Sequence, residues 1–70
     1  MAKHPVDPLR TRLDELTQQA TDHTTQLRDF AMVPGNAWLA KGELQQLTTV
    51  LSDLEALLED IKRQDVENGY

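Results

Sequence analysis

The chain has 70 residues, a formal net charge of −5 and no cysteine. A chain of this length forms at most one small domain, and without cysteine it has no disulfide and no cysteine-ligated metal to stabilise it. Twelve acidic against seven basic side chains argue against a nucleic-acid-binding protein, which needs clustered Lys and Arg to neutralise phosphates. Association with another chain is the remaining common way to stabilise so small a protein.

Residues 1–7 are expected to form a flexible N-terminal lead-in to the first helix. The first residues, Met-Ala-Lys-His-Pro, have no apolar segment of the kind found in a secretory signal peptide. No apolar run approaches the roughly 18 residues of a membrane span. Together with the absence of cysteine, these features lead us to expect a cytoplasmic protein with no membrane partner.

A first helix is expected over residues 8–32. Asp7 can cap the free backbone amides, and proline at the first helical position, here Pro8, loses no hydrogen bond there. The apolar residues then recur with the alternating spacing of three and four that marks the packed side of a helix. This predicted seam comprises Val6, Leu9, Leu13, Leu16, Ala20, His23, Leu27 and Phe30.

A turn is expected over residues 33–36, because Pro34 excludes the helical conformation for the residue before it and Pro34-Gly35 favours a turn. Asn36 can cap a second helix, expected over residues 37–64 and followed by a frayed tail at 65–70. Its predicted seam comprises Ala37, Ala40, Leu44, Leu47, Leu51, Leu54, Leu58 and Ile61. The sequence therefore predicts an all-α fold, a coiled-coil-like antiparallel hairpin of two helices.

The second helix carries a wider apolar stripe than one neighbouring helix can cover. Val50 and Leu57 lie beside the predicted seam, and three apolar positions per heptad are typical of a helix with two or more neighbours. We therefore expect two hairpins to pair into a homodimeric four-helix bundle. The alternative is that Val50 and Leu57 are scattered surface residues. The predicted dimer interface comprises Val50, Leu57, Leu54, Leu47, Leu58 and His23.

His23 is the polar residue of the first seam. Single polar residues in such seams fix the alignment of helices at some cost in stability. If His23 is buried and neutral, acid destabilises the protein and His23→Leu stabilises it. The alternative is that His23 tilts outward or that a carboxylate from the second chain pairs with it, and such pairing reverses the dependence on pH.

The turn end holds a second apolar group of residues. Two interpretations are open for Trp38: it folds over the turn and closes the end of the bundle, or it is an anchor for a partner protein, a role that Trp often has at interfaces. The predicted partner-binding residues are Trp38, Leu39, Met32, Val33 and Phe30. An acidic run on the second helix, from Asp53 to Asp60, is either a solvated face or a surface that attracts a basic partner.

The sequence lacks the residue patterns that catalysis, metal binding or phosphate binding require. Ser52 is the only serine, and no histidine is near it in sequence. His4 and His23 lack the spacing of a metal-binding pair, and the three glycines are isolated, so no phosphate-binding loop exists. We expect neither catalysis nor a cofactor.

The helix–turn–helix pattern resembles several families of small hairpins. It is similar to the Rop type, whose hairpins pair into a four-helix bundle and bind RNA through basic residues of the first helix; only Arg10, Arg12 and Arg28 match that requirement here. It also resembles the small co-chaperones of type III secretion in length, acidity and helical layout. In size, it is similar to compact phage proteins that inhibit a host regulator. The secreted WXG-type hairpins have a Trp-x-Gly motif that this turn lacks.

The function expected from the sequence is a homodimeric adaptor or inhibitor that occupies the surface of a partner protein. The alternatives are a secretion-type co-chaperone that covers an amphipathic client helix as a heterodimer, and a structural self-assembly protein.

Overall fold

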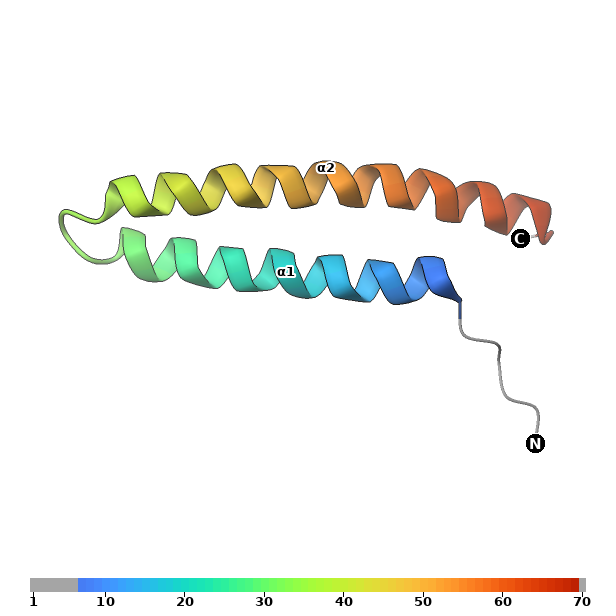
Figure 1. Cartoon of the computed structure of the whole chain (residues 1–70), viewed down its shortest axis with the longest axis horizontal. Coiled ribbons are helices and arrows are strands. Elements are labelled where there is room, and N and C mark those ends of the chain that lie inside the picture. Colours follow the sequence, from blue (N-terminus) through green and yellow to red (C-terminus); the bar gives the residue numbers. More distant parts are fainter. Residues whose placement is uncertain (1–6, 70) are drawn as a thin grey trace, which may run out of the picture.

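The computed structural model describes residues 7–69, which form two α-helices and the turn between them (Figure 1). Helix α1 spans Pro8–Ala31 and helix α2 spans Ala37–Glu67, so α2 extends three residues beyond the predicted end at 64. The two helices run antiparallel and pack along their length (Figure 1). The predicted all-α hairpin is therefore confirmed. The expected lead-in falls mainly on residues 1–6, which lie outside the described residues.

Asp7 begins helix α1 as an N-cap. Its carboxylate accepts a hydrogen bond from the backbone N–H of Leu9 at 3.0 Å, and its carbonyl accepts one from the N–H of Thr11 at 2.9 Å. Arg10 donates to the same carboxylate at 2.6 Å. The side-chain hydrogen bond from Arg10 is the main reason why the pKa of Asp7 is lowered from its usual 3.8.

Acid is expected to weaken this cap. Because the pKa of Asp7 is lowered by folding, its contribution to stability is present above its unfolded pKa and is lost as the pH falls through the folded one. The measurement is the urea midpoint of unfolding at pH 6 and pH 2.5 for the parent and for Asp7→Asn. The midpoint of the variant should fall less on acidification. An equal fall in both proteins would assign the acid sensitivity to other carboxylates.

The turn between the helices is short and closed by backbone hydrogen bonds. The N–H of Val33 donates to the carbonyl of Phe30 at 3.1 Å, and that of Asn36 donates to the carbonyl of Val33 at 3.1 Å. Gly35 has φ +91°, a left-handed conformation that glycine adopts without strain. Asn36 is at the N-cap position of α2, but its side chain makes no capping hydrogen bond. The expected capping role of the Asn36 side chain is thus wrong.

The core lies between the helices and is small. Its buried members are Leu16 of α1 and Val50, Leu57 and Ile61 of α2. Partly buried side chains pack against them: Leu9, Leu13, Ala20 and Leu54. On α1, the described part of the predicted seam is the side that faces α2: each of its seven residues is buried or half-buried.

On α2 the predicted seam is only half right. Ala40 and Ile61 are buried and Leu47 and Leu54 are half-buried, as expected. Ala37, however, is exposed. Leu44, Leu51 and Leu58 are about half exposed, at 50%, 51% and 51%. Their places against α1 are taken by Val50 and Leu57, which are only 7% and 8% exposed. Helix α2 is therefore rotated about its axis relative to the sequence-based expectation.

A polar contact between the helices favours this rotation. The apolar stripe of α2 is wide enough to offer α1 either set of residues. Packing through Val50 and Leu57 also brings Glu43, seven residues before Val50, against α1, where its carboxylate lies 2.7 Å from Nδ1 of His23. If Leu44, Leu51 and Leu58 packed against α1 instead, Glu43 would point away from His23. The half-buried His23 would then lack this hydrogen-bond partner, and leaving a partly buried polar group unpaired costs free energy.

Candidate interaction surfaces

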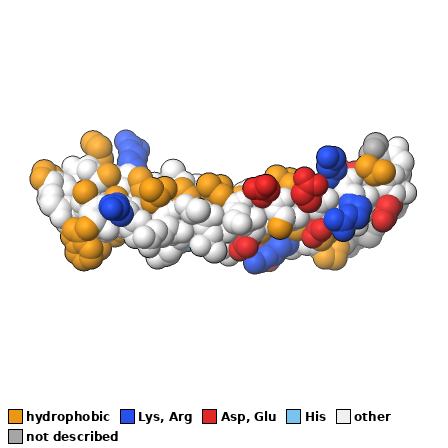
Figure 2. Space-filling view, turned by 90° about the horizontal axis from the view of Figure 1, so that it is seen from above, with side chains coloured by type: hydrophobic (Ala, Val, Ile, Leu, Met, Phe, Trp, Pro, Cys, Tyr) orange, Lys and Arg blue, Asp and Glu red, His pale blue; other side chains and the backbone are white. Residues whose placement is uncertain are grey.

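Three half-exposed leucines form a straight row along α2. Leu44, Leu51 and Leu58 are spaced by seven residues, which keeps them on one side of a helix. Asp65 continues the same row toward the C-terminus. We call Leu44, Leu51 and Leu58 the leucine row. Figure 2 shows hydrophobic side chains along one edge of α2, in the half nearer the turn, and carboxylates gathered over the other half.

Helix α1 contributes threonines to the same face of the hairpin. Arg10, Thr17 and Thr24 are also spaced by seven residues. Arg10 contacts Asp65 through Nη2, at 2.9 Å and 3.1 Å from the two carboxylate oxygens. Because this ion pair joins the end of one row to the end of the other, both rows border one face. We call the surface formed by the leucine row, Thr17 and Thr24 the leucine face.

The threonine hydroxyl groups on the leucine face, and that of Thr48 beside it, already have hydrogen-bond partners. Thr17 donates to the carbonyl of Asp14 at 2.9 Å and Thr24 to that of Ala20 at 2.7 Å. Thr48, between Leu44 and Leu51, donates to the carbonyl of Leu44 at 2.9 Å. A partner that covers this face therefore leaves none of these donors unpaired, which removes the main cost of burying polar groups.

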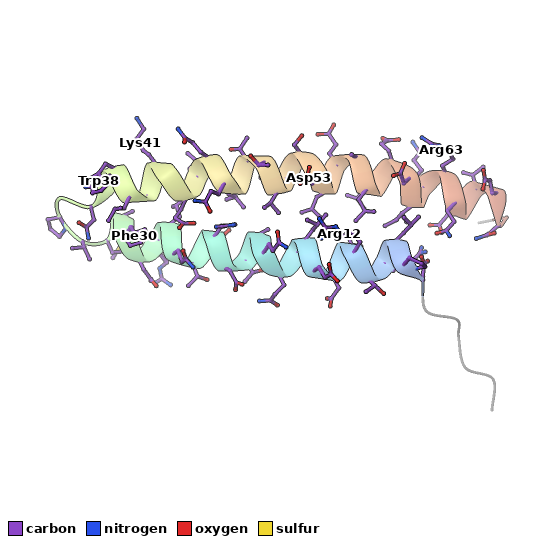
Figure 3. The ribbon with its side chains drawn as sticks, in the orientation of Figure 1. Arg12, Phe30, Trp38, Lys41, Asp53 and Arg63 are labelled. Carbon is purple, nitrogen blue, oxygen red and sulfur yellow. The ribbon has the colours of Figure 1, made fainter. Side chains whose placement is uncertain are left out.

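The second candidate surface is at the turn. Met32 is 74% exposed, Trp38 is 70% exposed and Val33 is 48% exposed. We call these three residues the turn-end patch. Phe30 and Leu39, predicted with them, are half-buried, and Figure 3 shows Phe30 on α1 and Trp38 on α2 at this end. In the single hairpin Trp38 stays exposed, and closure of the end of a four-helix bundle by Trp38 stays a prediction.

The predicted dimer interface needs correction on two points. Val50 and Leu57 were assigned to an outer flank of α2, whereas both are buried between the helices of one chain. Leu54 and Leu47 also face α1, and of the predicted set only Leu58 is exposed. The leucines of α2 that do remain exposed, Leu44, Leu51 and Leu58, were instead assigned to the seam. Dimerisation itself stays a prediction, with the leucine row as the exposed apolar strip.

His23 is half-buried and pairs with a carboxylate. Its partner is Glu43 of the same chain, 2.7 Å from Nδ1, and the two side chains are 22% and 12% exposed. A carboxylate opposite His23 was one of the expected alternatives, but it was expected on a second chain. The structure thus assigns His23 to the contact between α1 and α2.

Removing one member of this pair should destabilise the hairpin. His23→Leu leaves the Glu43 carboxylate without its partner, and we expect a loss of about 1–3 kcal/mol in the free energy of unfolding. The double variant His23→Leu/Glu43→Leu should be as stable as the parent or more stable, because apolar pairs often replace partly buried polar pairs without loss. Denaturant unfolding of the parent, His23→Leu, Glu43→Leu and the double variant gives a double-mutant cycle, which measures the interaction energy of the pair. A His23→Leu protein more stable than the parent would show that the contact carries no stability.

An open depression of about 290 Å³ lies on α2, lined by Ser52, Glu55, Ala56 and Glu59. All four residues come from one helix. Within residues 7–69, no group of three or more His, Cys, Asp or Glu side chains is placed to hold a metal ion. Neither described helix is long and apolar enough to cross a membrane.

Three features of these surfaces were not predicted from the sequence. Leu44, Leu51 and Leu58 were expected in the seam, and no role was predicted for Glu43 or for the ion pair of Arg10 with Asp65. The placement of charge was the signal in the sequence that could have revealed these contacts. In an antiparallel hairpin, Glu43 comes close to His23 and Asp65 comes close to Arg10. The chain matches no protein-family model, no curated protein and no solved structure.

Proposed function

We propose that this chain is a small, non-enzymatic protein–protein interaction module of the cytoplasm. In this proposal two hairpins pair into a four-helix bundle, and the homodimer acts as an adaptor or inhibitor by occupying the surface of another protein. The observation that carries it is the exposure of Trp38 and Met32, at 70% and 74%. Large apolar side chains grouped at one end of a small protein are typical of a binding surface.

Trp38 is expected to contribute to partner binding and little to stability. Trp38→Ala should change the free energy of unfolding by no more than about 0.5 kcal/mol, as is usual for exposed positions. It should also abolish capture of a partner that the tagged parent enriches from its native host. Arg63→Ala is the matched control, because Arg63 lies near the other end of α2 and its side chain is 72% exposed.

Fluorescence gives a direct reading of the same site. Trp38 is the only tryptophan, so its emission reports the turn-end patch alone, and binding of the captured partner should shift the emission to shorter wavelength. A Trp38→Ala protein that captures the same partner equally well would refute the patch as the binding surface. A loss of several kcal/mol in stability would instead assign Trp38 to packing, as in large-to-small core substitutions.

A secretion-type co-chaperone is the second candidate. The leucine row favours it, because a half-exposed apolar strip on a helix can be covered by an amphipathic helix of a client. Light scattering coupled to size exclusion separates the two functions. A folded homodimer at micromolar concentration supports the adaptor, whereas a chain that is molten alone and folds only with a client supports the co-chaperone.

A further inference from the structure

We propose that a second copy of this chain covers the leucine face, with the two α2 helices antiparallel and Leu51 on the two-fold axis. The inference rests on the proposed function for the homodimer and adds its geometry. Leu44 and Leu58 are each seven residues from Leu51. A two-fold axis through Leu51 therefore places Leu44 of each copy against Leu58 of the other.

The size of the leucine face fits a stable dimer. Helix α1 has 24 residues, about 36 Å at 1.5 Å per residue, and α2 runs alongside it over this length. Two packed helices are roughly 20 Å wide, given an axis separation of about 8–10 Å and their side chains. One face therefore offers about 700 Å² per copy, and a pair would bury about 1,400 Å², within the range of stable interfaces.

Charge decides between antiparallel and parallel packing. Residues 53–67 of α2 carry six carboxylates against two basic groups, whereas residues 37–52 carry only Lys41 and Glu43. Parallel packing would bring the two acidic segments together, where like charges repel. Antiparallel packing places the acidic segment of each copy beside residues 37–52 of the other, where the charges of Lys41 and Glu43 cancel. Figure 3 shows Lys41 projecting from α2 away from α1.

This geometry makes the dimer bivalent. Trp38 precedes Leu51 by 13 residues, about 20 Å along the helix. The two turn-end patches would therefore lie about 40 Å apart, at opposite ends of the bundle. A partner with two matching sites would bind with an avidity that exceeds the affinity of one patch.

Cysteine cross-linking tests the arrangement directly, because the chain has no cysteine of its own. Leu51→Cys should cross-link to itself in high yield with a short bis-maleimide. Leu44→Cys and Leu58→Cys should each give little product alone and a high yield when the two proteins are mixed. Ser52→Cys is the control, since Ser52 is next to Leu51 but on a different side of α2, and it should remain largely uncross-linked.

Three outcomes would overturn the proposal: a monomer at micromolar concentration, self-cross-linking of Leu44→Cys as strong as that of the mixture, or equal yields for Ser52→Cys and Leu51→Cys. The proposed function fails separately. If the cross-linking pattern is as expected but Trp38→Ala captures the same partner as the parent, the dimer stands and the turn-end patch is not the binding surface.

Discussion

Leu57→Glu is expected to unfold the hairpin, whereas Leu58→Glu should leave it folded. Leu57 is 8% exposed and Leu58 is 51% exposed, although the two leucines are neighbours in sequence. A carboxylate at position 57 would be buried without a partner in the contact between the helices, at a cost of about 3 kcal/mol or more. Such a loss is a large part of the stability of a small domain.

Circular dichroism and light scattering measure this pair of variants. Leu57→Glu should lose most of its helical signal. Leu58→Glu should keep the signal and, if the leucine face forms the dimer, elute as a monomer. On the sequence-based assignment the roles are reversed, with Leu58 in the seam and Leu57 on the dimer flank. A folded Leu57→Glu protein beside an unfolded Leu58→Glu protein would therefore restore that assignment.

Leu16→Ala is expected to have the largest effect among truncations in α1. Leu16 is 2% exposed and packs against Val50, Leu57 and Ile61 in the core cluster. Truncating a leucine in such a position costs about 2–5 kcal/mol, from lost burial and from the cavity left behind. The measurement is the free energy of unfolding from urea titration, in which the slope should stay unchanged if only stability is affected.

Val66→Ala is the matched control, because Val66 is 66% exposed and its truncation should cost less than about 0.5 kcal/mol. A Leu16→Ala protein as stable as the control would mean that Leu16 is not the centre of the core.

The two helices differ in how much of their packing the sequence could predict. Helix α1 has one narrow apolar side, so the spacing of its residues specifies the side that faces α2. Helix α2 has leucines on two overlapping sides, and the spacing alone does not choose between them. The choice depends on contacts between distant residues, such as His23 with Glu43, which a pattern along one helix does not contain.

At the turn end, too, the sequence predicts which residues are neighbours but not which of them are exposed. Sequence analysis grouped the five apolar residues correctly as neighbours of the turn, but their exposure depends on the backbone of residues 32–36. Helix α2 begins at Ala37, and its rotation leaves Trp38 in solvent while Leu39 is half-buried. Neither result follows from hydrophobicity, since Trp38 and Leu39 are adjacent and both are strongly apolar.

The uneven distribution of the core sets the order in which the hairpin opens. Leu16, Val50, Leu57 and Ile61 form the core cluster, and on α2 these residues begin near the middle and continue toward the C-terminus. Nearer the turn, only the small side chain of Ala40 is buried. Local opening costs least where few apolar contacts are lost. We therefore expect amide hydrogens near the turn to exchange with solvent through small fluctuations, and those around Leu57 to exchange only on global unfolding. The turn end is therefore the part of the molecule that can adjust its shape to a bound surface while the rest of the hairpin stays closed.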